Sequence, residues 1–150
     1  MEIEVRGMTP LLQVFDMLAS LKFYCDVLGF GIVNTVGKPA PNCDWVLLKW
    51  GAVTLMLNTA YEAPHRPPRP VPNRVVAHRD LCLYFGCPNV DDAYRNLHAV
   101  GVEAEVPKVA PYGMKQLYLA DPGGYSLCFQ WPEIKGRVLL PGSYGCPVLA

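Results

Sequence analysis

Residues 116–131 read QLYLADPGGYSLCFQW, and this stretch determines which fold the chain can adopt. Two runs of apolar, aromatic and small polar residues, which are typical of β-strands, flank the sequence DPGG. That sequence predicts the turn between the two strands, with Gly124 available for a positive φ. The stretch therefore predicts a β-hairpin, and it places Cys128 in the middle of the second strand.

The hairpin ends a unit that the chain contains twice. In the second half, a strand is expected at 80–87, a helix at 89–101 with Gly101 at its end, and a strand at 102–106 before the hairpin. In the first half, the order is an apolar strand, a helix, a strand and two further strands. The two halves match at an offset of about 72 to 73 residues, which indicates an internal repeat. Neither half could bury its sheet alone.

The helix of the first half has clear boundaries. Asp16 is placed to cap its first turn, and apolar residues follow at helical spacing up to Leu28. Gly29 is expected to end the helix. The sequences GIVNTV at 31–36 and WVLLKWGAVTLMLN at 45–58 predict the three strands that follow, the last two turning near Gly51.

These patterns predict an α+β protein made of two paired β-α-β-β-β modules. We expect the first module at 1–58, a proline-rich linker or lid at 59–79, the second module at 80–131 and a C-terminal tail at 132–150. The proline-rich segment is expected to be semi-rigid and extended. The tail contains apolar residues, which suggests that it docks on the same chain or on a partner subunit.

Composition excludes several classes of function. Lys plus Arg and Asp plus Glu both number 13, so the formal net charge is zero and no basic stripe predicts a nucleic-acid partner. No apolar run approaches the roughly 20 residues of a membrane span. The sequence MEIEVRGMTP at the start lacks the features of a secretory signal, so we expect a cytoplasmic protein. The six cysteines contain no C-x-x-C pair and are expected to be reduced.

Three stretches carry a resemblance to a known superfamily. They are LQVFDMLASLKFYCDVLGF at 12–30, YFGCPNVDDAYRNLHAVGV at 84–102 and YGMKQLYLADPGGYSLCF at 112–129. Together they resemble the glyoxalase, bleomycin-resistance and extradiol-dioxygenase superfamily, also called vicinal oxygen chelate proteins, over about residues 9–131. The resemblance implies that the two modules form a curved mixed-sheet cup. It also implies a homodimer, which in this superfamily can exchange modules.

The resemblance also implies where metal ligands would stand. In metal-dependent members, four His or Glu side chains lie on the floor of the cup, and these positions correspond here to Thr9, Met56, Cys82 and Cys128. None of the four keeps a hard ligand, so the usual divalent metal is not expected. A two-thiol site for zinc or Cu(I), formed by Cys82 and Cys128, is the alternative.

Strand alternation from these positions predicts the rest of the cup lining. The expected ligand-binding residues are Thr9, Gln13, Met56, Cys82, Tyr84, Gln116, Tyr118, Cys128 and Gln130. This lining is neutral, polar and aromatic, which suits a small organic ligand held by hydrogen bonds and ring stacking. The sequence therefore predicts a protein that binds a small, neutral, aromatic molecule without a metal or another cofactor.

An enzyme remains the alternative. It would be a metal-dependent or thiol-dependent glyoxalase-like lyase, or an extradiol-type dioxygenase. A nucleophilic Cys82 or Cys128 would need a nearby base such as His78, but an extended strand would hold His78 about 13 Å from Cys82. Tyr84, Tyr118 or His78 could instead act as a general acid or base, and the sequence does not select among them.

Overall fold

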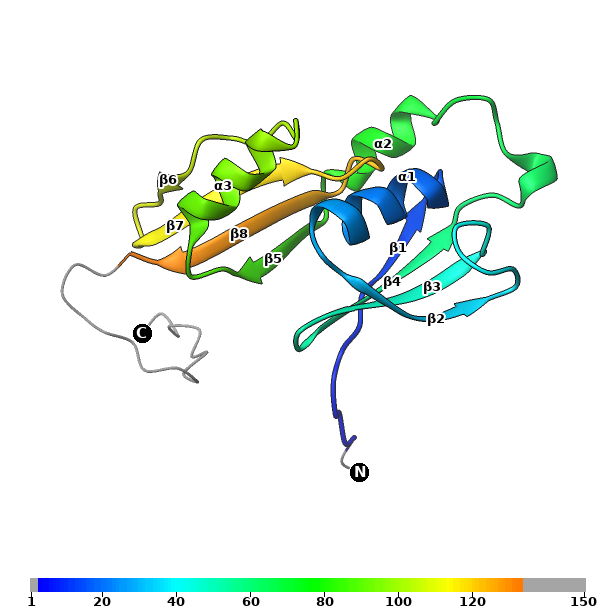
Figure 1. Cartoon of the computed structure of the whole chain (residues 1–150), viewed down its shortest axis with the longest axis horizontal. Helices are drawn as coiled ribbons and strands as arrows, with labels where there is room; N and C mark the ends of the chain where they lie inside the picture. The colour runs from blue at the N-terminus through cyan, green and yellow to red at the C-terminus, as the bar shows by residue number, and fades with distance from the viewer. Residues whose placement is uncertain (1–2, 134–150) are drawn as a thin grey trace.

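The structure is a computed structural model, and it describes residues 3–133. It contains two four-stranded sheets with helices packed against them (Figure 1). The strand orders are β1-β4-β3-β2 and β5-β8-β7-β6, so the two sheets repeat the same topology. The expected α+β fold of paired modules is confirmed. The predicted docking of the tail concerns residues that lie almost entirely outside the described ones.

The first sheet comes from the first half of the chain. Its strands are β1 (Leu11–Val14), β2 (Gly31–Val36), β3 (Trp45–Trp50) and β4 (Val53–Thr59), and only the β1–β4 pair is parallel. Asp16 caps α1 (Met17–Leu21) as expected, because its Oδ1 accepts hydrogen bonds from the backbone N–H groups of Leu18 and Ala19. The helix continues as a π-helix, η1 (Lys22–Val27), and ends before Gly29, whose φ is +93°.

The second sheet contains β5 (Cys82–Gly86), β6 (Lys108–Val109), β7 (Met114–Ala120) and β8 (Ser126–Pro132), with α3 (Val90–Ala99) packed against β7 and β8. The hairpin predicted at 116–131 is confirmed as β7 and β8, and Gly124 in its turn has a φ of +88°.

The expected strand at 102–106 is wrong. Within it, only Ala104 makes a bridge, to Leu119, and the strand next to β7 is β6 at Lys108–Val109. Pro107 separates the two and has no N–H to continue a ladder.

The proline-rich segment is only partly extended. It contains a short 3₁₀-helix, η2 (Ala63–His65), and the helix α2 (Pro72–His78), so the extended conformation expected for the whole segment is wrong. The ring of His78 stacks on Tyr125 in the hairpin turn, with centroids 4.1 Å apart and planes 6° from parallel. His78 Nδ1 donates a hydrogen bond to the Gly123 carbonyl at 2.7 Å. Through His78, α2 therefore packs against the turn between β7 and β8.

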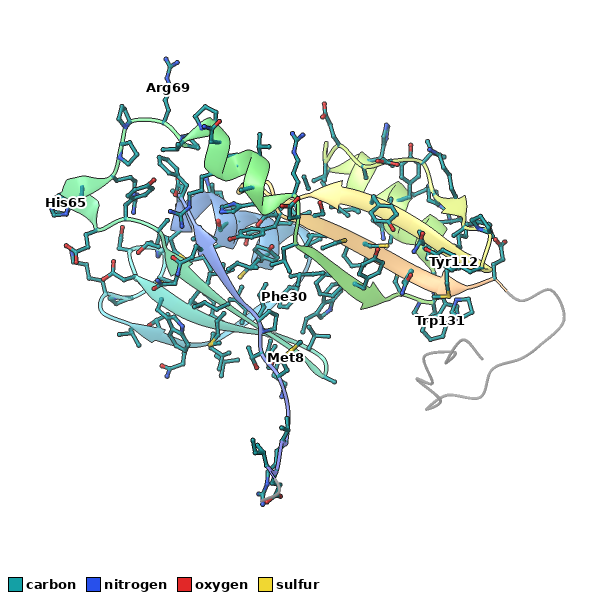
Figure 2. The ribbon with its side chains drawn as sticks, turned by 180° about the vertical axis from the view of Figure 1, so that it is seen from behind. Met8, Phe30, His65, Arg69, Tyr112 and Trp131 are labelled. Carbon is teal, nitrogen blue, oxygen red and sulfur yellow. The ribbon has the colours of Figure 1, made fainter. Side chains whose placement is uncertain are left out.

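One apolar core extends through both modules. Phe30, which lies where the two sheets meet in Figure 2, packs against Phe85 with ring centroids 6.3 Å apart. Trp50 contacts Phe129 in the same way at 6.3 Å. The two halves therefore cover each other's apolar surface, as neither could do alone.

Candidate functional site

The second sheet has one apolar face and one polar face. Leu117, Leu119, Leu127 and Phe129 are buried in the core on the side of α3. The alternate residues of β7 and β8 point to the opposite side, since successive side chains of a strand point to opposite faces. That side carries six of the predicted ligand-binding residues, Cys82, Tyr84, Gln116, Tyr118, Cys128 and Gln130. We call these six residues the polar face.

A phenol pair crosses the polar face. Tyr84 and Tyr118 both lie opposite Cys128 in the strand register, one from each neighbouring strand. Their hydroxyl oxygens are 3.1 Å apart, and the rings meet edge to face with centroids 6.4 Å apart. Tyr84 is 54% exposed, so its ring remains open to a ligand.

A chain of side-chain hydrogen bonds lies in the next row. Tyr112 donates to Gln116 Oε1 at 3.1 Å, and Gln116 Nε2 donates to Gln130 Oε1 at 2.9 Å. Gln116 is buried, and two hydrogen bonds fix its orientation. The sequence did not indicate Tyr112, because it lies in the loop before β7, where strand alternation gives no information. Figure 2 shows Tyr112 near the end of the second sheet that also carries Trp131.

A cavity of about 270 Å³ adjoins the polar face at the sheet edge. It is lined by Glu105, Val106, Lys108, Val109, Ala110, Gln116 and Tyr118. A larger cavity, of about 350 Å³, lies where α3 begins, but none of the predicted ligand-binding residues lines it. Its lysine, Lys115, is already paired with Asp91 at 2.6 Å, and Arg95 is paired with Asp92. We therefore take the smaller cavity as the candidate site.

The polar face is electrically neutral. Burial, with a smaller contribution from Cys82, raises the pKa of the Cys128 thiol to about 11. Burial also raises the pKa of Cys82, while the hydrogen bond to Tyr84, followed by burial, raises the pKa of Tyr118. All three groups are protonated near pH 7. A thiolate nucleophile of the kind that the enzyme alternative needs is therefore disfavoured.

His78 does not support a thiol mechanism. The sequence placed it on the strand of Cys82, but in the structure it is the last residue of α2. Its ring stacks on Tyr125 and is hydrogen-bonded to the Gly123 carbonyl. His98 lies on α3 beside Tyr94, and His65 is exposed near Glu62.

We expect Cys128 to resist alkylation in the native protein. It has no exposed surface, and its raised pKa leaves very little thiolate at pH 7.5. Iodoacetamide labelling followed by mass spectrometry should leave Cys128 unmodified until urea is added, while the half-buried Cys25 reacts slowly. If Cys128 reacted faster than free cysteine, the thiol-dependent alternative would regain support.

The other three predicted residues form a separate group on the first sheet. The hydroxyl oxygens of Thr9 and Thr54 are 2.7 Å apart, and Gln13 Oε1 accepts a hydrogen bond from Asn58 Nδ2 at 3.4 Å. Met56 on β4 lies opposite Leu11 on β1 in the strand register. Among the residues that the structure describes, no side-chain hydrogen bond joins this group to the polar face. The expected lining is therefore divided between two sheets whose strands do not pair with one another. The backbone of Gln13 does reach the second module, because its N–H and carbonyl are both hydrogen-bonded to the Tyr125 hydroxyl.

Metal-ligating side chains do not gather in the described part of the chain. Within residues 3–133, no three or more His, Cys, Asp or Glu side chains lie close enough together to hold an ion. Cys82 and Cys128 lie on neighbouring strands. In the described residues, a zinc or Cu(I) ion bound there would have only these two thiols as ligands from such a group.

Comparison with known proteins decides the family. The model of the glyoxalase/bleomycin resistance protein/dioxygenase superfamily matches residues 8–129. The chain belongs to this superfamily. It is also 31% identical over 119 residues to the uncharacterized protein YaeR of Escherichia coli K12, covering 75% of this chain and 84% of that protein. The family predicted from the three sequence stretches is thus confirmed.

Several solved structures share the fold. A bleomycin resistance determinant encoded on the transposon Tn5 is 22% identical, with a TM-score of 0.61 and coverage of 87% of this chain and 100% of that one. TnmS3, an antibiotic binding protein from Streptomyces sp. CB03234, is 21% identical, with a TM-score of 0.64 and coverage of 87% and 99%. A bleomycin-binding protein solved with bleomycin is 23% identical, with a TM-score of 0.60 and coverage of 86% and 100%. At these identities the likeness establishes the fold of this superfamily member.

None of the helices in residues 3–133 is long and apolar enough to cross a membrane.

Proposed function

We propose that this superfamily member binds a small, neutral, aromatic organic molecule on the polar face, without a metal. The observation that supports this most strongly is the placement of the phenol pair and the amide chain in neighbouring rows beside the cavity of about 270 Å³. A few fixed polar groups on an otherwise apolar wall orient a ligand, and aromatic rings supply stacking area. Bleomycin and antibiotic binding by structural relatives is compatible with this class of function.

The thiol-dependent and metal-dependent alternatives have less support. Both thiols have raised pKa values, so neither is a ready nucleophile. Thr9, Met56, Cys82 and Cys128 offer no carboxylate or imidazole for a hard divalent cation.

We further propose that two chains form the complete cup as a homodimer in the cytoplasm. Leu11 is exposed on β1, an edge strand of the first sheet, and a second chain would cover it. The cysteines of the described residues are free, as expected in a reducing compartment. Sedimentation equilibrium should give the mass of two chains.

The proposed function is tested by titration with a neutral tricyclic ketone, 9-fluorenone, in isothermal calorimetry. We expect binding with the same affinity before and after treatment with a chelator, with metal content checked by elemental analysis. Tyr118→Phe should weaken binding by about fivefold to tenfold, because one hydrogen bond contributes about 1 kcal/mol. The same change on the far side of the sheet, Tyr94→Phe, should leave the affinity unchanged.

Two results would contradict the proposal. One is binding that disappears with the metal and returns when Mn, Fe, Ni or Zn is added. The other is equal affinity for the Tyr118 variant and the native protein, which would place the ligand elsewhere.

A further inference from the structure

We propose that the polar face selects ligands whose hydrogen-bonding groups are acceptors, namely carbonyl or ether oxygens on a neutral planar ring system. This inference rests on the proposed function and names the ligand class of the same site. Three observations support it: the direction of the hydrogen bonds on the polar face, the lack of charge on its side chains, and the cavity beside it.

The hydrogen-bond chain has a direction. Tyr112 donates to Gln116, and Gln116 donates to Gln130, so the carbonyl oxygen of each glutamine already accepts a bond. Each amide carries two N–H donors, and only one N–H of Gln116 is used in the chain. Among the described residues, Gln130 Nε2 has no partner. The chain therefore ends on a half-buried amide that offers N–H groups to a ligand.

The phenol pair adds a donor in the adjacent row. When Tyr84 and Tyr118 share one hydrogen bond, one hydroxyl hydrogen is used between them. The other lies beside a thiol, because Tyr84 is hydrogen-bonded to Cys82 and Tyr118 to Cys128, and a ligand oxygen would replace that weak sulfur partner. The rows are next to each other on the sheet, because Tyr118 and Gln116 are two residues apart on β7 and share a face. A ligand lying across both rows would thus meet donors from each.

The charge of the face favours a neutral ligand. The thiol of Cys128 and the phenol of Tyr118 are protonated near pH 7. The nearest cation in the lining is Lys108, opposite Gln116 in the register, and it lies 3.9 Å from Glu105. A ligand carboxylate would find no unpaired cation among the described lining residues. A ligand ammonium would find one carboxylate in the lining, that of Glu105, which is already paired with Lys108.

The experiment compares three tricyclic probes of nearly the same shape: 9-fluorenone, an acceptor; 9-fluorenol, a donor and acceptor; and fluorene, which has neither. We expect the native protein to bind 9-fluorenone about tenfold more tightly than fluorene, since each hydrogen bond contributes about 1 kcal/mol. Gln130→Glu keeps the oxygen that accepts from Gln116 but removes both N–H donors. It should lower the affinity for 9-fluorenone by tenfold or more and leave fluorene unchanged.

The control is Asn96→Asp, the same amide-to-carboxylate change at an exposed position on α3, behind the sheet. It should alter none of the three affinities. If fluorene binds the native protein as tightly as 9-fluorenone, the inference about acceptors fails while the proposed function stands. A preference for 9-fluorenol over 9-fluorenone would reverse the direction of the chain and also overturn the inference. If none of the probes binds, both the inference and the proposed function fail.

Discussion

Asp121→Ala should reduce the free energy of unfolding by about 4 kcal/mol, because this buried carboxylate holds three donors. Tyr24 donates to Asp121 Oδ2 at 3.0 Å, and the N–H groups of Gly123 and Tyr125 donate to Oδ1 at 2.8 and 2.9 Å. Alanine would leave all three without a partner, in a site where Tyr24 has no exposed surface. Urea unfolding followed by circular dichroism measures the loss.

Two further variants keep this prediction testable if the alanine variant does not fold. Tyr24→Phe removes one of the hydrogen bonds between the two halves of the chain and should cost about 1–2 kcal/mol. Asp121→Asn keeps an oxygen for the two backbone donors and should cost less than alanine. Equal stability of the alanine variant and the native protein would show that the carboxylate does not hold the hairpin turn.

The same carboxyl group should impose a pH dependence on stability. Burial raises the pKa of Asp121, although hydrogen bonds from Tyr125, Tyr24 and Gly123 act in the opposite direction. The folded state therefore binds the proton more tightly than the unfolded state. The stability that this group contributes is fully present below its unfolded pKa, near 4, and is lost as the pH rises through the folded value. Asp121→Asn should remove that slope.

Gly124→Ala should destabilise the protein by about 3 kcal/mol, for two reasons that act together. Its φ of +88° is unfavourable for any residue with a Cβ, and that Cβ would lie 2.7 Å from both the Cγ1 and the carbonyl oxygen of Val75. The helix α2 would have to move away from the turn.

Gly113→Ala is the matched control for this change. Its φ is +84°, but nothing lies within 4 Å of the added Cβ, so only the backbone cost of about 1 kcal/mol is expected. A similar loss for both variants, measured by urea unfolding, would show that the contact with α2 contributes nothing.

Local sequence signals predicted the parts of the fold that depend on neighbouring residues. The cap by Asp16 and the positive φ of Gly124 follow from chain positions a few residues apart. Pro72 at the first position of α2 is also a local signal for a helix start. The helix was not predicted, because the prolines before it made the whole segment resemble an extended linker. The bond from Tyr24 to Asp121 spans 97 positions and has no local signal.

For the candidate site, the sequence predicted which side chains share a face of the second sheet. Alternation along β7 and β8 correctly put Gln116, Tyr118 and Gln130 on one face, because side-chain direction in a strand depends only on position. Tyr112 was missed because it acts from a loop. The position of Gln13 relative to the polar face depends on how the two sheets pack, which no local pattern records.

The most direct test of the polar face as the ligand site is a nitrogen-15 NMR titration of the side-chain amide groups with 9-fluorenone. We expect the NH₂ signals of Gln116 and Gln130 to shift and saturate together, while that of Asn96 on α3 stays in place. Shifts centred instead on Asn89, which lines the larger cavity where α3 begins, would place the ligand there and contradict the proposal.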